Sequence, residues 1–173
     1  MTGACLNLLP RDADRLAREI SHLLIRDKKT LAFGESCTGG LMAFLFTSLA
    51  GSSAYFKLSA VTYANEAKVK LLGVRPKTLE KHGAVSEAVA GEMALGARLA
   101  GMADYGLSTT GIAGPSGGSD EKPVGMVCVG LSSASGTDTW VFKEDTGDRN
   151  ANQHLFAAFA LYRLHCLILE ESP

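Results

Sequence analysis

A short apolar run passes directly into small polar residues and two glycines in FGESCTGGLMAF, residues 33–44. The apolar residues at 31–33 are typical of a short buried strand. The apolar run after the glycines predicts a helix over about 41–50. This strand–turn–helix unit carries Ser36 and Cys37 in its turn. The turn therefore either presents a nucleophile at the end of a strand or is only a polar connection.

Outward from this unit, helical and strand patterns alternate along the chain. Apolar residues at helical spacing predict helices over 12–27, 41–50, 66–73, 87–100 and 148–170. Runs rich in β-branched and aromatic residues predict strands over 29–34, 54–64, 105–111, 124–133 and 137–144. The last two strands are expected to form an antiparallel pair. We expect Asn65 and Ser86 to cap the helices that follow them.

Strands that alternate with helices and end in a hairpin predict an α/β fold. The expected architecture is a three-layer α/β/α sandwich on a mixed β-sheet, in a single domain over 1–173. Ligands of such sheets bind beyond the carboxyl ends of the strands. Glycine-rich turns at 39–40 and 111–118 both follow predicted strands, so both could border one crevice. The final helix is apolar on most sides, so we expect it to be largely buried, partly in a contact within a homo-oligomer.

Composition limits the classes of partner. The chain has 173 residues, of which 46% are hydrophobic and 20% charged, as in soluble globular proteins. Seventeen basic and eighteen acidic residues give a net charge of -1, so we expect neither nucleic acid nor a membrane as partner. No signal peptide or zinc spacing is recognisable, which predicts a cytoplasmic protein with four free cysteines: Cys5, Cys37, Cys128 and Cys166.

The two glycine-rich turns are the first candidates for chemistry. ESCTGG does not fit the G-x-S-x-G pattern, and GIAGPSGG lacks the lysine of a phosphate-binding P-loop. Glycines free to adopt positive φ can still turn their N–H groups inward, and Gly39 and Gly40 stand at a helix N-terminus that favours an anion. Such loops suit a phosphate or a developing oxyanion. The alternative is that both are ordinary tight turns.

A serine nucleophile needs a base, and a lysine is the best candidate. Tyr63 ends a predicted strand and Lys68 lies about one turn into the next helix, so both can point toward the same sheet edge. A partly desolvated lysine can lose its proton and activate a serine, with Tyr63 relaying the proton or positioning the substrate. The alternative is a surface lysine and a half-buried tyrosine. Cys37 is intrinsically the better nucleophile, but its place after Ser36 lets it face the core. Histidines are expected only at surface or packing positions: His22, His82, His154 and His165.

Several motifs together carry a resemblance to a known family. They are ESCTGG, VTYANEAKVKLLGV, HGAVSEAVAGEMALGAR, STTGIAGPSGG, EKPVGMV and GDR. In this order, they make the chain similar to the CinA C-terminal domain family. The resemblance implies an α/β/α fold without metal or other cofactor. It also implies an amidohydrolase that converts nicotinamide mononucleotide to nicotinate mononucleotide and ammonia.

Carried over to this chain, the resemblance implies Ser36 as nucleophile, with Lys68 and Tyr63 as its activating partners. The substrate-binding residues implied in the same way are Thr38, Gly39, Gly40, Thr110, Gly111, Gly114, Gly117 and Arg149, the last as a phosphate contact.

Two positions depart from the family pattern. Leu58 and Ser59 stand where the family usually has two glycines. The chain could therefore be a non-catalytic nucleotide-binding or regulatory module, or an amidase for another small amide.

Overall fold

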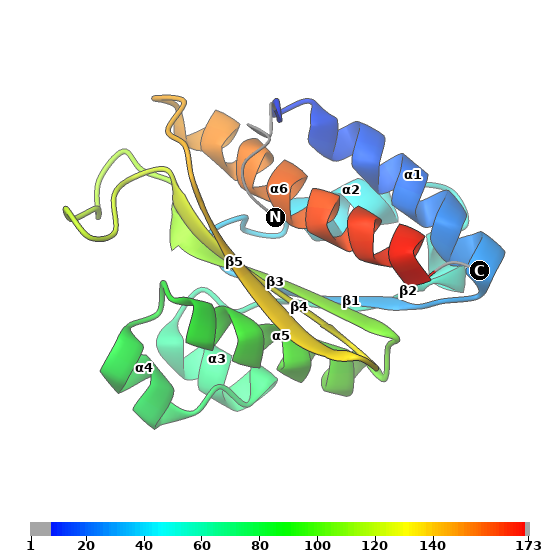
Figure 1. Ribbon diagram of the computed structural model, residues 1–173, viewed down its shortest axis with the longest axis horizontal. Helices are drawn as coiled ribbons and strands as arrows, with labels where there is room; N and C mark the ends of the chain where they lie inside the picture. The colour runs from blue at the N-terminus through cyan, green and yellow to red at the C-terminus, as the bar shows by residue number, and fades with distance from the viewer. Residues whose placement is uncertain (1–7, 172–173) are drawn as a thin grey trace.

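Five strands form one mixed sheet in the computed structural model, which describes residues 8–171 (Figure 1). The strands are β1 (Leu31–Glu35), β2 (Phe56–Val61), β3 (Tyr105–Ile112), β4 (Met126–Ser133) and β5 (Gly136–Lys143). Their order across the sheet is β2-β1-β3-β4-β5. β1 runs parallel to β2 and β3, whereas β4 is antiparallel to β3 and β5. The predicted mixed sheet and its late hairpin are confirmed.

Helices cover both faces of this sheet. They are α1 (Asp12–Asp27), α2 (Leu41–Thr47), α3 (Asn65–Leu72), α4 (Pro76–His82), α5 (Glu87–Gly101) and α6 (Arg149–Glu171), with a 3-10 turn, η1, at Ser52–Ala54. Figure 1 shows α1, α2 and α6 on one face and α3, α4 and α5 on the other. The predicted three-layer α/β/α architecture is confirmed.

Local sequence explains most helix positions. Leu16, Ile20 and Leu24 of α1 are four residues apart and all buried, as the apolar spacing predicts. The Ser86 side chain accepts the N–H of Val89, so the predicted cap of α5 is confirmed. The Asn65 cap is wrong because Asn65 is already the first residue of α3 and Ala64 precedes the helix without a side-chain cap.

The sequence did not predict α4. Its residues, PKTLEKH, contain only one strongly apolar side chain besides proline, so no helical periodicity is visible. Pro76 begins the helix at a position where a fixed φ is favourable and the missing N–H has no helical acceptor. Gly83 then ends it, and its N–H donates to the carbonyl of Leu79.

The larger core lies between the sheet and the layer of α1, α2 and α6. α6 contributes a continuous set of buried apolar residues, including Phe156, Leu161 and Leu164. Helix α6 packs along α1 and over β3 and β4. The prediction that this helix is largely buried is confirmed. Its contact with a second copy of the chain stays a prediction.

The described residues add three further observations. Across 8–171 no helix is both long and apolar enough to cross a membrane. Cys37, Cys128 and Cys166 are free thiols, and Cys5 lies outside the described residues. Within the same range, no group of three or more histidine, cysteine or acidic side chains could hold a metal ion.

Candidate active site

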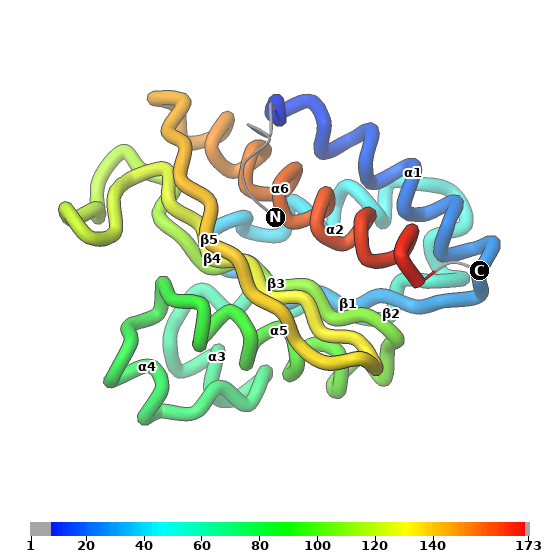
Figure 2. Tube along the Cα trace, viewed as in Figure 1, coloured from blue at the N-terminus to red at the C-terminus, as the bar shows by residue number. Residues whose placement is uncertain are grey.

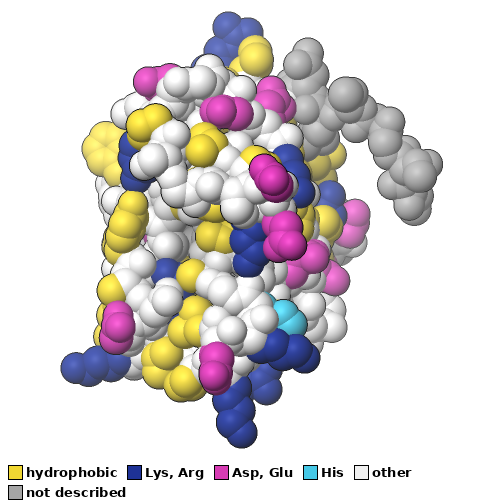
Figure 3. All heavy atoms as spheres, turned by 90° about the vertical axis from the view of Figure 1, so that its left-hand side faces the viewer, with side chains coloured by type: hydrophobic (Ala, Val, Ile, Leu, Met, Phe, Trp, Pro, Cys, Tyr) yellow, Lys and Arg dark blue, Asp and Glu magenta, His cyan; other side chains and the backbone are white. Residues whose placement is uncertain are grey.

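The carboxyl ends of three parallel strands meet at one end of the molecule, on the left in Figure 1. Glu35, the last residue of β1, is level with Val61 of β2 and Thr109 of β3. The N–H of Ser36 donates to the carbonyl of Thr109 at 3.0 Å, which fixes the chain as it leaves β1. Figure 3 views this end, where both signs of charge are scattered among neutral side chains.

Ser36 and Lys68 meet at this end of the sheet. The Nζ of Lys68 lies 3.1 Å from Ser36 Oγ, 2.7 Å from the carbonyl oxygen of Thr62 and 3.2 Å from that of Tyr63. Lys68 is only 1% exposed and Ser36 9%. Helix α3 brings Lys68 to this position from the face opposite α2. The structure therefore joins the two side chains that the sequence predicted to cooperate.

Burial lowers the pKa of Lys68 from its ordinary value, because an ammonium group is poorly solvated there. The three oxygen partners suit either protonation state. An ammonium group donates one hydrogen to each. A neutral amine donates to the two carbonyl groups and offers its lone pair to the Ser36 hydroxyl. The serine can therefore pass its proton to Lys68 without leaving a buried polar atom unpaired.

Cys37 turns in the opposite direction. Its side chain is 4% exposed and packs in the larger core, as the sequence interpretation allowed. Burial raises the pKa of its thiol to about 12. A thiol with that pKa is protonated at neutral pH and is a weak nucleophile.

Glu35 is the main residue of the site that sequence reasoning missed. Its buried carboxylate accepts N–H groups from Gly40, Met42 and Ala43 and hydroxyl groups from Thr38 and Ser59. The protein's own carboxylate thus occupies the N-terminus of α2, where we had expected glycine N–H groups to face a bound anion. An acidic residue just before the predicted helix was the available signal.

The remaining members of the turn are held within it. Gly39 adopts a φ of 64° and Gly40 a φ of 98°, values that favour glycine. The N–H of Gly39 donates to the carbonyl of Ser36 at 3.1 Å. The Thr38 hydroxyl donates to Glu35 and lies 2.8 Å from the Thr109 hydroxyl. Residues 36–40 therefore form a rigid turn around the serine.

Arg149 links the two loops that follow β2 and β3. Its Nη1 donates to the carbonyl of Gly114 at 2.5 Å, and its Nη2 donates to the Tyr63 hydroxyl at 2.9 Å. The Tyr63 side chain is 61% exposed. Among the hydrogen bonds of residues 8–171, none joins the Tyr63 hydroxyl to Ser36 or Lys68. Tyr63 meets the lysine through its backbone carbonyl instead.

The glycine-rich loop after β3 lies beside Arg149. Gly114 and Gly117 have positive φ angles of 84° and 92°. A cavity of about 190 Å³ lies next to this loop, lined by Ala113, Pro115, Val124, Asp145, Gly147, Arg149 and Asn152. Thr110 and Gly111, two other predicted binding residues, do not line this cavity. The Thr110 hydroxyl donates to the carbonyl of Ala84, and Gly111, which has no side chain, lies within β3.

Buried Asn152 ties the surrounding loops together. Its amide nitrogen donates to the carbonyl of Ala113 at 3.1 Å and to Asp145 at 2.8 Å. Its amide oxygen accepts the N–H and the hydroxyl of Thr146. Figure 2 shows the loops before β4 and before α6 at the same end of the molecule. Asn152 therefore fixes both of these loops beside Arg149.

The two departures from the family pattern lie outside the Ser36–Lys68 contact. The Ser59 hydroxyl donates to Glu35 at 3.1 Å, so it adds to the set of bonds that hold the turn. Leu58 packs against the smaller apolar cluster between the sheet and α5. Among the described residues, no hydrogen bond joins either side chain to Lys68 or Ser36.

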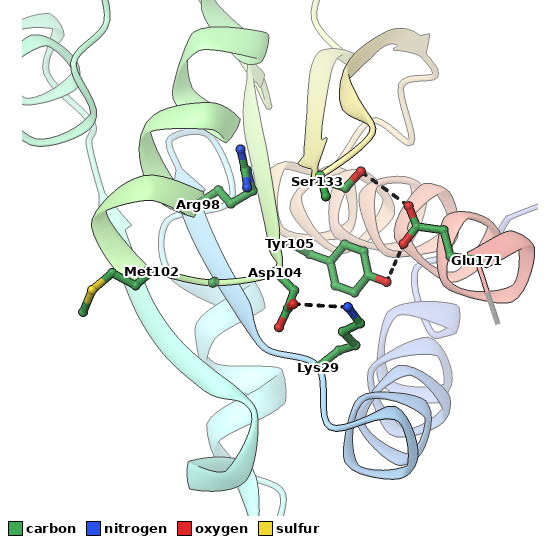
Figure 4. A pocket seen from close by; sticks show the side chains of 9 residues that line it. Lys29, Arg98, Met102, Asp104, Tyr105, Ser133 and Glu171 are labelled. Carbon is green, nitrogen blue, oxygen red and sulfur yellow. Dashed lines mark hydrogen bonds and ion pairs between the residues drawn. The ribbon is translucent and has the colours of Figure 1, made fainter. Parts of the chain in front are cut away.

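A separate cavity of about 190 Å³ lies at the opposite end of the sheet (Figure 4). Several of its polar groups are bonded to one another: Lys29 lies 3.3 Å from Asp104, and the Tyr105 hydroxyl donates to Glu171 at 2.7 Å. None of the predicted site residues lines it. This cavity is therefore not part of the candidate active site.

Comparisons with known proteins find similar sequences and similar structures. A "CinA-like protein" of Desulforapulum autotrophicum is 51% identical over 89% of this chain, which spans 36% of that relative. "Nicotinamide-nucleotide amidohydrolase PncC" of Escherichia coli is 47% identical over 87% of this chain and 91% of the relative. The crystal structure of competence/damage inducible protein CihA from Agrobacterium tumefaciens has a TM-score of 0.88 and 39% identity, and the match covers 94% of this chain and 99% of that one.

The chain corresponds to only part of its longer relatives. The chain spans 36–37% of the length of the first two curated relatives that it matches. The family described as "CinA C-terminal domain" matches residues 13–168, which include every predicted site residue. The chain belongs to the CinA C-terminal domain family.

Proposed function

We propose that this chain hydrolyses the carboxamide of nicotinamide mononucleotide, releasing nicotinate mononucleotide and ammonia. The observation that carries the proposal is the buried contact of Ser36 Oγ with Lys68 Nζ at 3.1 Å, beyond the carboxyl ends of the parallel strands. The relative named nicotinamide-nucleotide amidohydrolase, at 47% identity, supports the choice of substrate.

Ser36 is the proposed nucleophile and Lys68 the proposed base. Lys68 takes the hydroxyl proton as Ser36 Oγ bonds to the carboxamide carbon. Cleavage of the carbon–nitrogen bond then forms the acyl-enzyme, and Lys68 returns the proton to the departing nitrogen, which leaves as ammonia. A water molecule gives a proton to Lys68 and attacks the ester carbon. Cleavage of the ester releases the acid, and the proton returns to Ser36.

Arg149 is the proposed phosphate contact. In this structure its guanidinium donates to two neutral acceptors, Gly114 O and Tyr63 Oη, both on loops beside the site. A phosphate would be a stronger acceptor for the same donors. The mononucleotide should therefore bind better than its riboside, which lacks the phosphate.

The experiment is incubation of the protein with nicotinamide mononucleotide while ammonia and nicotinate mononucleotide are both measured. We expect the two products in equal amounts, and none from Ser36→Ala. Ammonia release from other small amides with no preference for the mononucleotide would instead indicate a different amidase. Binding of the mononucleotide without any ammonia would indicate a non-catalytic module.

Nicotinamide riboside tests the phosphate contact in the same assay. Arg149→Met should weaken mononucleotide binding about ten- to hundredfold, because a charge-assisted bond contributes roughly 1.5–3 kcal/mol. Binding of the riboside should change little. Lys57→Met is the matched control, since Lys57 is an exposed cation on β2 at the other end of the strand. An equal loss for both ligands in Arg149→Met would assign Arg149 a structural role.

A further inference from the structure

Gln153 of α6 reaches across to the turn that carries Ser36. Its side-chain nitrogen donates to the backbone carbonyl of Cys37 at 2.8 Å, a contact between residues 116 positions apart in the sequence. Gln153 lies in the first turns of α6, next to Asn152 and one helical turn after Arg149. A residue outside the predicted site therefore holds the peptide group directly after the nucleophile.

The peptide between Cys37 and Thr38 is planar and trans, since the cis bond of the described residues is Gly114–Pro115. In a trans peptide the N–H points opposite to the C=O. A carbonyl held toward α6 thus directs the N–H of Thr38 away from α6. Lys68 approaches Ser36 from α3, on the other face of the sheet. The Thr38 N–H therefore points toward the side of the sheet from which Lys68 reaches Ser36.

Most other N–H groups of this turn are already used. Ser36 donates to Thr109, Gly39 to Ser36 and Gly40 to Glu35. The hydrogen bonds within residues 8–171 leave the N–H of Thr38 without an acceptor, whereas the N–H of Cys37 interacts with its own thiol. An uncommitted N–H group close behind a nucleophilic serine can stabilise a tetrahedral oxyanion.

We infer that Gln153 is a positioning residue that holds the Thr38 N–H as an oxyanion donor. The inference rests on the proposed serine chemistry and deepens it. Gln153 touches neither substrate nor the reacting atoms: it acts through the Cys37 carbonyl. Glu35 holds the same turn through Thr38 and Gly40, and Gln153 adds a bond to the carbonyl of the 37–38 peptide itself.

Two substitutions separate the hydrogen bond from packing. Gln153→Met keeps a side chain of similar length but has no donor, whereas Gln153→Lys keeps a donor that can reach the carbonyl. We expect kcat to fall about ten- to hundredfold in Gln153→Met with little change in KM, since loss of a whole oxyanion donor costs about 10²–10³. Gln153→Lys should recover much of kcat. His154→Gln, on the next residue of α6, is the control and should behave as wild type.

The affinity for a transition-state-like ligand is a measurement that a change in packing alone would not alter. An analogue with an aldehyde in place of the carboxamide would form a tetrahedral adduct with Ser36, whereas nicotinate mononucleotide forms none. Gln153→Met should weaken binding of the aldehyde at least tenfold and leave binding of the acid unchanged. Wild-type kcat in Gln153→Met, or equal weakening of both ligands, would overturn the inference.

Modification of Ser36 by phenylmethylsulfonyl fluoride distinguishes this inference from the proposed substrate. Ser36 Oγ bonds to sulfur, the sulfur–fluorine bond breaks, fluoride leaves and Lys68 takes the hydroxyl proton. The rate of modification should fall in Gln153→Met even if nicotinamide mononucleotide proves not to be the substrate. An unchanged rate, with wild-type modification readily measured, would reject the role of Gln153 alone. Failure to modify wild-type Ser36 would reject the serine chemistry and this inference together.

Discussion

At the scale of single residues, the two side chains that follow β1, the proposed nucleophile Ser36 and its neighbour Cys37, lie in different surroundings. Ser36 Oγ meets Lys68, while the Cys37 thiol is buried in the core with its pKa raised to about 12. Ser36→Ala should therefore abolish turnover, and Cys37→Ala should keep most of it at a modest loss of stability. Steady-state kinetics and denaturant unfolding of both variants check this. Full activity in Ser36→Ala with loss in Cys37→Ala would reverse the assignment.

Lys68 predicts how kcat/KM depends on pH. Its pKa is lowered by burial, and only the neutral amine can accept the Ser36 proton. We expect kcat/KM to rise with pH through the lowered pKa and then level off. Lys68→Arg should be nearly inactive despite its charge, because a guanidinium does not lose its proton. Substantial activity in Lys68→Arg would mean that the positive charge matters and that the base lies elsewhere.

The lowered pKa also predicts how stability changes with pH. Between that pKa and the ordinary value of 10.5, the unfolded chain binds a proton at Lys68 that the folded chain does not. The free energy of unfolding must therefore rise with pH in this window. Lys68→Met has no such group, so wild type should gain stability relative to it as pH rises. A constant difference between the two proteins from neutral pH to about 10 would contradict the shift.

At the scale of secondary-structure elements, the strand–turn–helix unit depends on Glu35. This carboxylate accepts three N–H groups in the first turn of α2 as well as the hydroxyl groups of Thr38 and Ser59. Glu35→Gln keeps the shape but removes the charge and replaces one of the two acceptor oxygens with an NH2 donor that faces N–H and hydroxyl donors. We expect a loss of about 3 kcal/mol in the free energy of unfolding, since bonds to charged groups contribute roughly 1.5–3 kcal/mol each.

Activity provides the second readout for Glu35. Because residues 36–40 share its hydrogen bonds, Glu35→Gln should also lower kcat under conditions where the protein is folded. Ser59→Ala removes one bond to the same carboxylate and should cost about 1 kcal/mol with near wild-type kcat. A Glu35→Gln protein as stable as wild type would show that the carboxylate does not hold this helix.

The elements also show what the sequence could predict. Sequence patterns predicted all five strands and every α-helix of the described residues except α4, whose seven residues have no apolar period. The order of strand and helix left both a contact of Lys68 with Ser36 and a surface lysine open, and the family resemblance selected the contact that the structure has. Gln153 could not be found in this way, because its partner is the backbone carbonyl of Cys37 in a distant segment, and a backbone partner leaves no residue-type pattern. Glu35 left only the weaker signal of an acidic residue before a predicted helix. The Tyr63 hydroxyl was expected near the pair and instead bonds to Arg149.

At the scale of the whole molecule, we expect the distances of α5 from the sheet and from α3 to determine where Lys68 lies. α5 lies close to the sheet because Gly106 and Gly130 have no side chains where their strands meet the carbonyl groups of Ala94 and Ala90. The same helix approaches α3 at Gly96, where a Cβ would overlap the carbonyl of Leu72. Leu72 lies one turn after Lys68 in α3, so the position of the lysine depends on this approach.

Two glycine substitutions in α5 test that dependence. Gly96→Ala must push α3 away from α5, because the obstructing atoms belong to the backbone. We expect a loss of about 1–3 kcal/mol in the free energy of unfolding. Turnover should fall about tenfold or more, since a displacement near 1 Å at a catalytic group can cost about a hundredfold. Denaturant unfolding and kcat, measured on the same preparation, check both effects.

Gly91→Ala is the matched control on the same helix. Its added Cβ would lie 3.2 Å from the Thr139 side chain, which can move, rather than against backbone. The alanine should even stabilise α5 by up to about 1 kcal/mol, because glycine is a poor helix former. We therefore expect Gly91→Ala to be fully active and at least as stable as wild type. Equal behaviour of the two variants would mean that the approach of α3 to α5 does not set the position of Lys68, and that the loop carbonyls of Thr62 and Tyr63 hold its contact with Ser36.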